Sequence, residues 1–166
     1  MEFMNHPIFR ASNRYHVPTK EMTQDLYKLY ELLRDLNLSL RSKQMSFETA
    51  ADCSDSWQIV CISYDAAKVI DSTESAKGLR RAHPISRKQR AERMFSEGKM
   101  AKGELIRYFF ENDTVVLVTS EENNMDGYDH WSKLSPVPEG ILTGGSFSVY
   151  ARKRDVDWVR GIIRKR

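Results

Sequence analysis

Positively charged side chains gather in two stretches of this sequence, at a density that suits contact with phosphate groups. Residues 77–107 contain ten Lys or Arg and three Asp or Glu, a local net charge of +7, and residues 152–166 contain seven and two, a local charge of +5. Neutralising a phosphate backbone requires such density but no fixed spacing. We therefore predict that nucleic acid, either DNA or RNA, contacts Arg80, Arg81, Arg87, Lys88, Arg90, Arg93, Lys99, Lys102, Arg152, Lys153 and Arg154.

The first basic stretch also carries the signals of two consecutive helices. Ser86 and Gln89 form the S-x-x-Q pattern of a capping box, which predicts a helix over residues 87–97. A second helix is predicted over residues 100–111, and two helices followed by strands suggest a winged helix-turn-helix. The second helix would expose two carboxylates, which suit DNA poorly. We therefore expect the first helix to contact the phosphate backbone, and not base edges.

An acidic stretch lies between the two basic ones, since residues 111–139 hold seven Asp or Glu and one Lys, a local charge of −6. Within it, Asp126, Asp129 and His130 supply oxygen and nitrogen ligands of the kind that bind divalent cations. Beside basic helices, such a cation could support phosphodiester cleavage. The spacing matches no zinc or two-metal pattern, and the sequence has neither a P-loop nor a G-x-S-x-G elbow. We predict no catalytic residue, metal ligand or cofactor, and a nuclease-like enzyme is the third hypothesis.

The acidic stretch and a heptad-patterned helix over residues 19–41 support a second hypothesis, in which the protein binds another protein as a regulator or inhibitor. Aromatic residues are frequent in protein interfaces, and an acidic loop can compete with nucleic acid for a basic groove on a partner. The residues predicted for this contact are Glu121, Glu122, Asp126, Tyr128, Asp129 and Trp131. The leading hypothesis is a non-enzymatic, regulatory nucleic-acid-binding protein. The charged stretches could instead neutralise one another within the fold, because charge runs are usually solvated faces.

The strongest helix signal begins at Thr19, which can cap a helix, and extends to about Arg41. Its apolar residues recur at intervals of four and three, at Met22, Leu26, Leu29, Leu33, Leu36 and Leu40. This seam favours a core helix that lies on a sheet, and a dimerising coiled coil is the alternative. Residues 42–56 are polar and rich in turn formers, although a short helix over residues 47–51 also fits.

Two apolar runs predict buried strands. Residues 57–64 (WQIVCISY) form a continuous apolar run, and residues 114–119 (TVVLVT) are apolar on both faces, as expected for a central strand. The remaining predicted elements are a long connection over residues 120–138, a hairpin of residues 141–143 and 146–152 around two glycines, and a terminal helix over residues 155–166.

Together these patterns predict an α+β fold, in which a single compact domain packs about four helices on a small, mostly antiparallel sheet of three or four strands. Residues 1–3 look like a cloning scar, and residues 4–166 are predicted to form the domain, with an irregular arm over residues 4–18. The sequence has two cysteines, no secretory signal and no apolar run of membrane-spanning length. We expect a cytoplasmic monomer or homodimer that does not contact a membrane.

Overall fold

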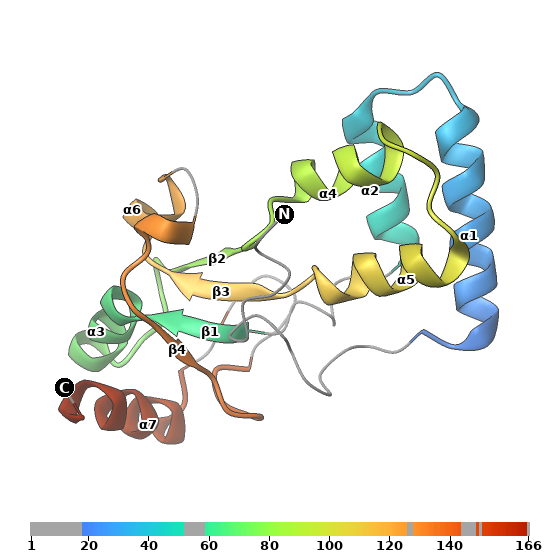
Figure 1. Ribbon diagram of the computed structural model, residues 1–166. Coiled ribbons are helices and arrows are strands. Elements are labelled where there is room, and N and C mark those ends of the chain that lie inside the picture. Colours follow the sequence, from blue (N-terminus) through green and yellow to red (C-terminus); the bar gives the residue numbers. More distant parts are fainter. Residues whose placement is uncertain (1–17, 52–58, 126–127, 144–148, 150, 166) are drawn as a thin grey trace. The chain divides into compact units, whose positions relative to one another are not determined.

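The α+β class is confirmed by a computed structural model, which describes residues 18–51, 59–125, 128–143, 149 and 151–165 (Figure 1). Those residues form seven α-helices and one sheet of four strands. Their contacts group into two compact units. We call them the helical unit (residues 18–51 and 85–113) and the sheet unit (described residues of 59–84 and 114–165). The expectation that residues 4–166 form one domain stays a prediction.

The sheet has the strand order β2-β3-β1-β4. At its centre, β1 (Ile59–Ser63) pairs in parallel with β3 (Val115–Val118), and every residue of both strands is buried. The outer strands β2 (Arg80–Ala82) and β4 (Leu134–Pro136) are each antiparallel to their neighbour. The predicted strand number, the mostly antiparallel pairing and the central position of the 114–119 strand are therefore confirmed.

Two helices of the sheet unit pack against each other, α3 (Tyr64–Thr73) and α7 (Lys153–Arg164) (Figure 1). The helix α3 follows β1 without a loop because Ser63 caps it, its Oγ accepting a hydrogen bond from the backbone N–H of Ala66 at 3.1 Å. The core that these helices share with the sheet includes Ile59, Ile62, Ala66, Ile70, Val115, Leu117, Val156 and Val159.

The long connection predicted over residues 120–138 is largely structured. It contains α6 (Ser120–Asn123), a 3₁₀ turn (Tyr128–His130) and β4.

The prediction of a hairpin is wrong for its first arm, because residues 141–143 form no strand. Leu142 has a φ of 51°, and its N–H donates to Asp155 Oδ1 at 3.2 Å instead of to a neighbouring strand. Most of the second arm, residues 146–148 and 150, lies outside the described residues.

The helical unit consists of α1 (Lys20–Asp35), α2 (Leu40–Ala50), α4 (Arg87–Phe95) and α5 (Lys102–Glu111). The single helix predicted over residues 19–41 is wrong, because the chain leaves the helical conformation at Leu36, whose ψ is 139°. Ser39 then caps α2, its Oγ accepting from the N–H of Ser42 at 3.1 Å. The predicted capping box of α4 is confirmed.

The core of the helical unit is built on aromatic side chains. Phe47 lies edge-on to Phe109, with ring centroids 4.9 Å apart, and Tyr30 and Phe95 extend the cluster. The hydroxyl of Tyr30 accepts a hydrogen bond from the N–H of Met100 at 2.9 Å. The helix α1 packs against α2 and α5, so the expectation that its apolar seam lies on a sheet is wrong. The buried residues of α1 are Leu26, Tyr30 and Leu33, and they cover helices instead of strands.

Candidate nucleic-acid interface

The structure assigns the residues of the predicted phosphate contact to both units. Arg80 and Arg81 are on β2 of the sheet unit, and Arg152, Lys153 and Arg154 stand at the start of α7 in the same unit. The other six residues lie in the helical unit, on α4, on α5 and between them: Arg87, Lys88, Arg90, Arg93, Lys99 and Lys102.

Arg90 is a buried residue, with 1% of its surface exposed. Its Nη1 lies 2.6 Å from Asp113 Oδ1, and its Nη2 lies 3.2 Å from Glu48 Oε1. The guanidinium also lies over the ring of Phe109, with Cζ 5.2 Å from the ring centroid. A buried charge requires such partners because its desolvation is costly. A phosphate group in solvent therefore cannot reach the Arg90 guanidinium.

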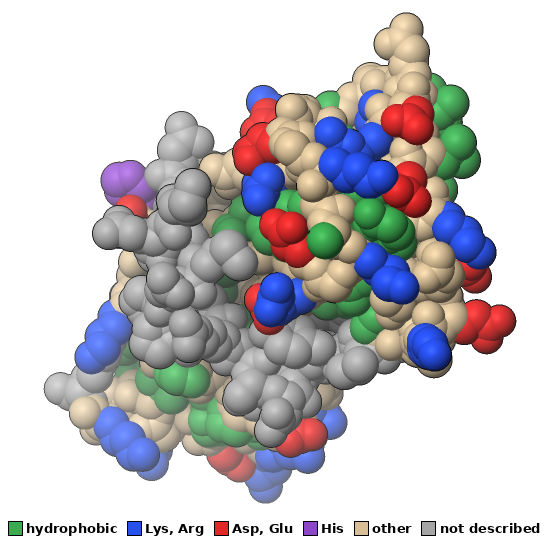
Figure 2. Space-filling view, turned by 45° about the vertical axis from the view of Figure 1, so that its right-hand side comes forward, with side chains coloured by type: hydrophobic (Ala, Val, Ile, Leu, Met, Phe, Trp, Pro, Cys, Tyr) green, Lys and Arg blue, Asp and Glu red, His purple; other side chains and the backbone are tan. Residues whose placement is uncertain are grey.

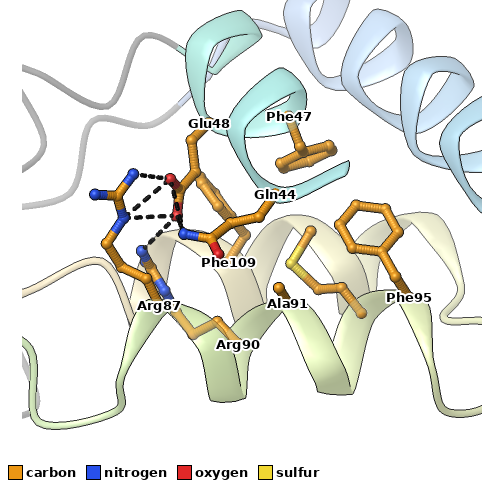
Figure 3. Close-up of a pocket in the computed structure, with 9 residues that line it drawn as sticks. Gln44, Phe47, Glu48, Arg87, Arg90, Ala91, Phe95 and Phe109 are labelled. Atoms are coloured by element: carbon orange, nitrogen blue, oxygen red, sulfur yellow. Dashed lines mark hydrogen bonds and ion pairs between the residues drawn. The ribbon is translucent and has the colours of Figure 1, made fainter. Parts of the chain in front are cut away.

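Glu48 joins a second arginine to this buried group (Figure 3). Arg87 donates through Nε to both oxygens of the Glu48 carboxylate, at 3.1 and 3.0 Å, and through Nη2 to Oε2. Gln44, one turn earlier on α2, donates its amide to the same carboxylate at 3.3 Å. Because Glu48 is only 8% exposed, this carboxylate ties α2 to α4 in the interior of the helical unit.

Three exposed cations of the predicted contact in the helical unit have acidic neighbours, whereas Lys102 donates to the amide oxygen of Gln24 at 2.9 Å. The ion pairs are Lys88 with Glu92, Arg93 with Glu97 and Glu104, and Lys99 with Glu31. Figure 2 shows Lys and Arg side chains interspersed with Asp and Glu over the helices. Each exposed pair contributes little to stability, but its carboxylate repels an approaching phosphate. The described face of this unit is therefore two-signed and not continuously basic.

The start of α7 brings two guanidinium groups together on one acceptor. Arg152 Nη2 donates to the carbonyl oxygen of Gly140 at 2.7 Å, and Arg154 Nη2 donates to the same oxygen. Both side chains also flank the buried Asp155, with Nε–Oδ distances of 3.2 Å for Arg152 and 3.8 Å for Arg154. About half of each arginine side chain is exposed, and Lys153 between them is exposed as well. The carboxylate that pairs with both arginines is buried, whereas the three cations are exposed.

Asp155 keeps its charge at this site. Burial by itself would raise the pKa of its carboxyl, but hydrogen bonds from the backbone and side chain of Arg152 and from the N–H of Leu142 outweigh it and lower the pKa. Arg152 N donates to Asp155 Oδ2 at 2.8 Å, so the carboxylate also caps the first turn of α7. Cations at the start of a helix lie against the positive end of its dipole, an arrangement that favours an added anion.

The residues predicted for a protein partner that the structure describes lie in the sheet unit and differ in exposure. Glu121 and Asp129 are exposed, whereas Trp131 is half-buried and donates its indole N–H to the carbonyl of Glu122 at 3.0 Å. Asp126 and the side chain of Tyr128 lie outside what the structure describes.

Glu122 is buried, with 4% of its surface exposed, and its carboxylate accepts hydrogen bonds from Ser63, Thr119 and Ser132. Burial alone would raise its pKa, but these bonds outweigh burial and lower it. Sequence reasoning missed this role, although Thr119-x-x-Glu122 has the spacing of a capping box, which the structure forms.

Among the described residues, no group of three or more His, Cys, Asp or Glu is placed to hold a metal ion. Within the same part of the chain, no helix combines the length and apolar character needed to cross a bilayer.

Comparisons of the chain with protein-family models, with curated proteins and with solved structures find no significant match.

Proposed function

We propose that the protein binds nucleic acid by its phosphate backbone, at the start of α7. The observation that carries the proposal is the convergence of Arg152 and Arg154 on the carbonyl oxygen of Gly140. Their bonds to Gly140, Thr143 and Asp155 use Nε and Nη2, and within the described residues neither Nη1 group has a hydrogen-bond partner. Two half-exposed guanidinium groups held in place in this way present donors suited to phosphate oxygens.

This proposal moves the contact from α4 to α7. Arg90 is buried, and the exposed Lys88 and Arg93 of α4 stand beside exposed carboxylates, whereas the carboxylate that pairs with Arg152 and Arg154 is itself buried. A contact of this kind recognises the charge of the backbone and not the base sequence. We therefore expect binding that is sensitive to salt and tolerant of sequence.

The test compares two double variants of α7 that remove the same charge. Lys153→Ala/Arg154→Ala removes two cations from the proposed contact, and Arg164→Ala/Lys165→Ala removes two from the opposite end of the helix. Binding of labelled single-stranded RNA and duplex DNA is followed by fluorescence anisotropy between 50 and 200 mM salt. Losing two phosphate contacts should reduce the slope of log K against log salt by about 1.8 for duplex and about 1.4 for single strands. Equal changes in the two variants would show a general charge effect and refute the proposed contact.

A second candidate function, protein binding, is favoured by apolar exposure in the helical unit. Leu32 on α1 and Leu36, the residue after that helix, are 55% and 42% exposed, and Leu38 and Met45 are 45% and 53% exposed. Exposed large apolar side chains are the kind of surface that a protein partner buries. Under this proposal, a partner that co-purifies with the wild-type chain should be lost from Leu32→Gln/Leu36→Gln and retained by Glu121→Gln. The reverse pattern would point to the acidic segment.

A further inference from the structure

The carboxyl ends of the parallel strands β1 and β3 hold a buried carboxylate in a set of four donors. Glu122 Oε2 accepts from Ser63 Oγ at 2.6 Å and from the N–H of Thr119 at 2.9 Å. Its Oε1 accepts from the N–H and the Oγ of Ser132, at 2.7 and 2.8 Å. Each oxygen thus receives two hydrogen bonds. The donors come from three segments, namely the end of β1, the residue that caps α6 and the segment before β4.

Both serine Oγ atoms in this set also accept a hydrogen bond from a backbone N–H. Ser63 Oγ accepts from the N–H of Ala66 at 3.1 Å, and Ser132 Oγ accepts from the N–H of Asp65 at 2.9 Å. A hydroxyl that accepts such a bond directs its own proton elsewhere, and here that direction is a Glu122 oxygen. The N–H groups of Thr119 and Ser132 are held by the backbone, and each serine Oγ is held in place by the backbone N–H that it accepts.

The chemistry of the donor set selects the group that it can hold. A carboxylate accepts on both oxygens and carries no proton, so it satisfies all four donors at once. An amide of the same shape would turn its NH₂ group toward two donors and leave them unpaired, which is costly in a buried site. The site therefore suits a carboxylate in preference to a neutral isostere.

We propose that these four donors form a preorganised binding site for a small carboxylate, which the chain fills with its own Glu122. The site does not depend on the covalent link to Glu122. A free carboxylate of suitable size should therefore enter when that side chain is shortened. Glu122→Ala removes a CH₂–COO⁻ group, which acetate matches in size and charge.

The experiment is a thermal-unfolding titration of Glu122→Ala at pH 7 and constant ionic strength, with sodium acetate, acetamide or sodium chloride as the additive. Acetate should raise the Tm of this variant in a saturable manner, because a ligand of the folded state stabilises that state. Acetamide and chloride should not. Wild-type protein and the matched Glu121→Ala variant, which removes an exposed carboxylate from the same helix, should not respond to acetate.

Equal responses to acetate and chloride, or equal responses of Glu122→Ala and wild type, would overturn the proposal. If Glu122→Ala is unfolded without additive, the same titration is read as recovery of the far-UV circular dichroism signal. A second variant, Glu122→Gln, keeps the site filled and should be less stable than wild type without responding to acetate. An acetate response of Glu122→Gln as large as that of Glu122→Ala would also overturn the proposal.

Discussion

Replacing Arg90 with Ala should destabilise the protein far more than replacing any exposed cation of α4. The Arg90 side chain is 2% exposed and bridges Asp113 at 2.6 Å and Glu48 at 3.2 Å. Its removal takes the paired cation from the buried Asp113 and leaves Arg87 as the cation paired with Glu48. Breaking a buried pair in this way costs about 3–5 kcal/mol. For a chain of this size, at about 2–4 °C per kcal/mol, the Tm should fall by about 6–20 °C.

The assay is urea unfolding followed by far-UV circular dichroism, with Lys88→Ala as the matched control on the same helix. The Lys88 side chain is 79% exposed and 3.8 Å from Glu92, so its loss should change the free energy of unfolding by less than about 0.5 kcal/mol. If Arg90→Ala and Lys88→Ala have similar unfolding free energies, the buried ion group contributes no more than a surface pair and the reasoning fails.

Three further predictions concern single hydrogen-bonding groups. Tyr30→Phe should lower the free energy of unfolding by about 1–3 kcal/mol in urea titrations, because the buried N–H of Met100 loses its acceptor; a loss no larger than that of Tyr27→Phe would contradict this. Thr19→Ala should cost about 1 kcal/mol in thermal unfolding by removing the cap of α1, and an unchanged Tm would show that the cap contributes nothing. The lowered pKa values of Glu122 and Asp155 mean that their stabilisation is complete above their ordinary values of 4.5 and 3.8, and is lost as pH falls through the lower folded-state values. Unfolding measured from pH 6 to pH 2 should show this loss in wild type and a smaller one in Glu122→Gln.

Local signals in the sequence predicted local structure well. The capping box of Ser86 and Gln89 predicted the start of α4, and the apolar run at residues 114–119 predicted a buried central strand. In both cases the signal lies within a few residues of sequence. The break between α1 and α2 was missed because the apolar seam continues through it. Ser39 in that segment was the available capping signal.

The burial of Arg90 could not be predicted from charge and periodicity alone. Its partners Glu48 and Asp113 lie on other elements, and only the tertiary structure brings the three groups together. One signal was present, since Arg90 precedes the buried Met94 by four residues and therefore shares its face of α4. The convergence of Arg152 and Arg154 on Gly140 likewise depends on a turn whose φ of 76° at Gly140 is not visible in the residue pattern.

The strand order has a consequence for how this chain is synthesised. Both neighbours of β1, β3 and β4, follow the helical unit in the sequence, and β3 is also the neighbour of β2. A nascent chain that has reached residue 113 therefore contains every described residue of the helical unit, while no strand of the sheet yet has its partner. The apolar β1 must wait unpaired until β3 leaves the ribosome, an interval in which an exposed strand edge is open to wrong partners.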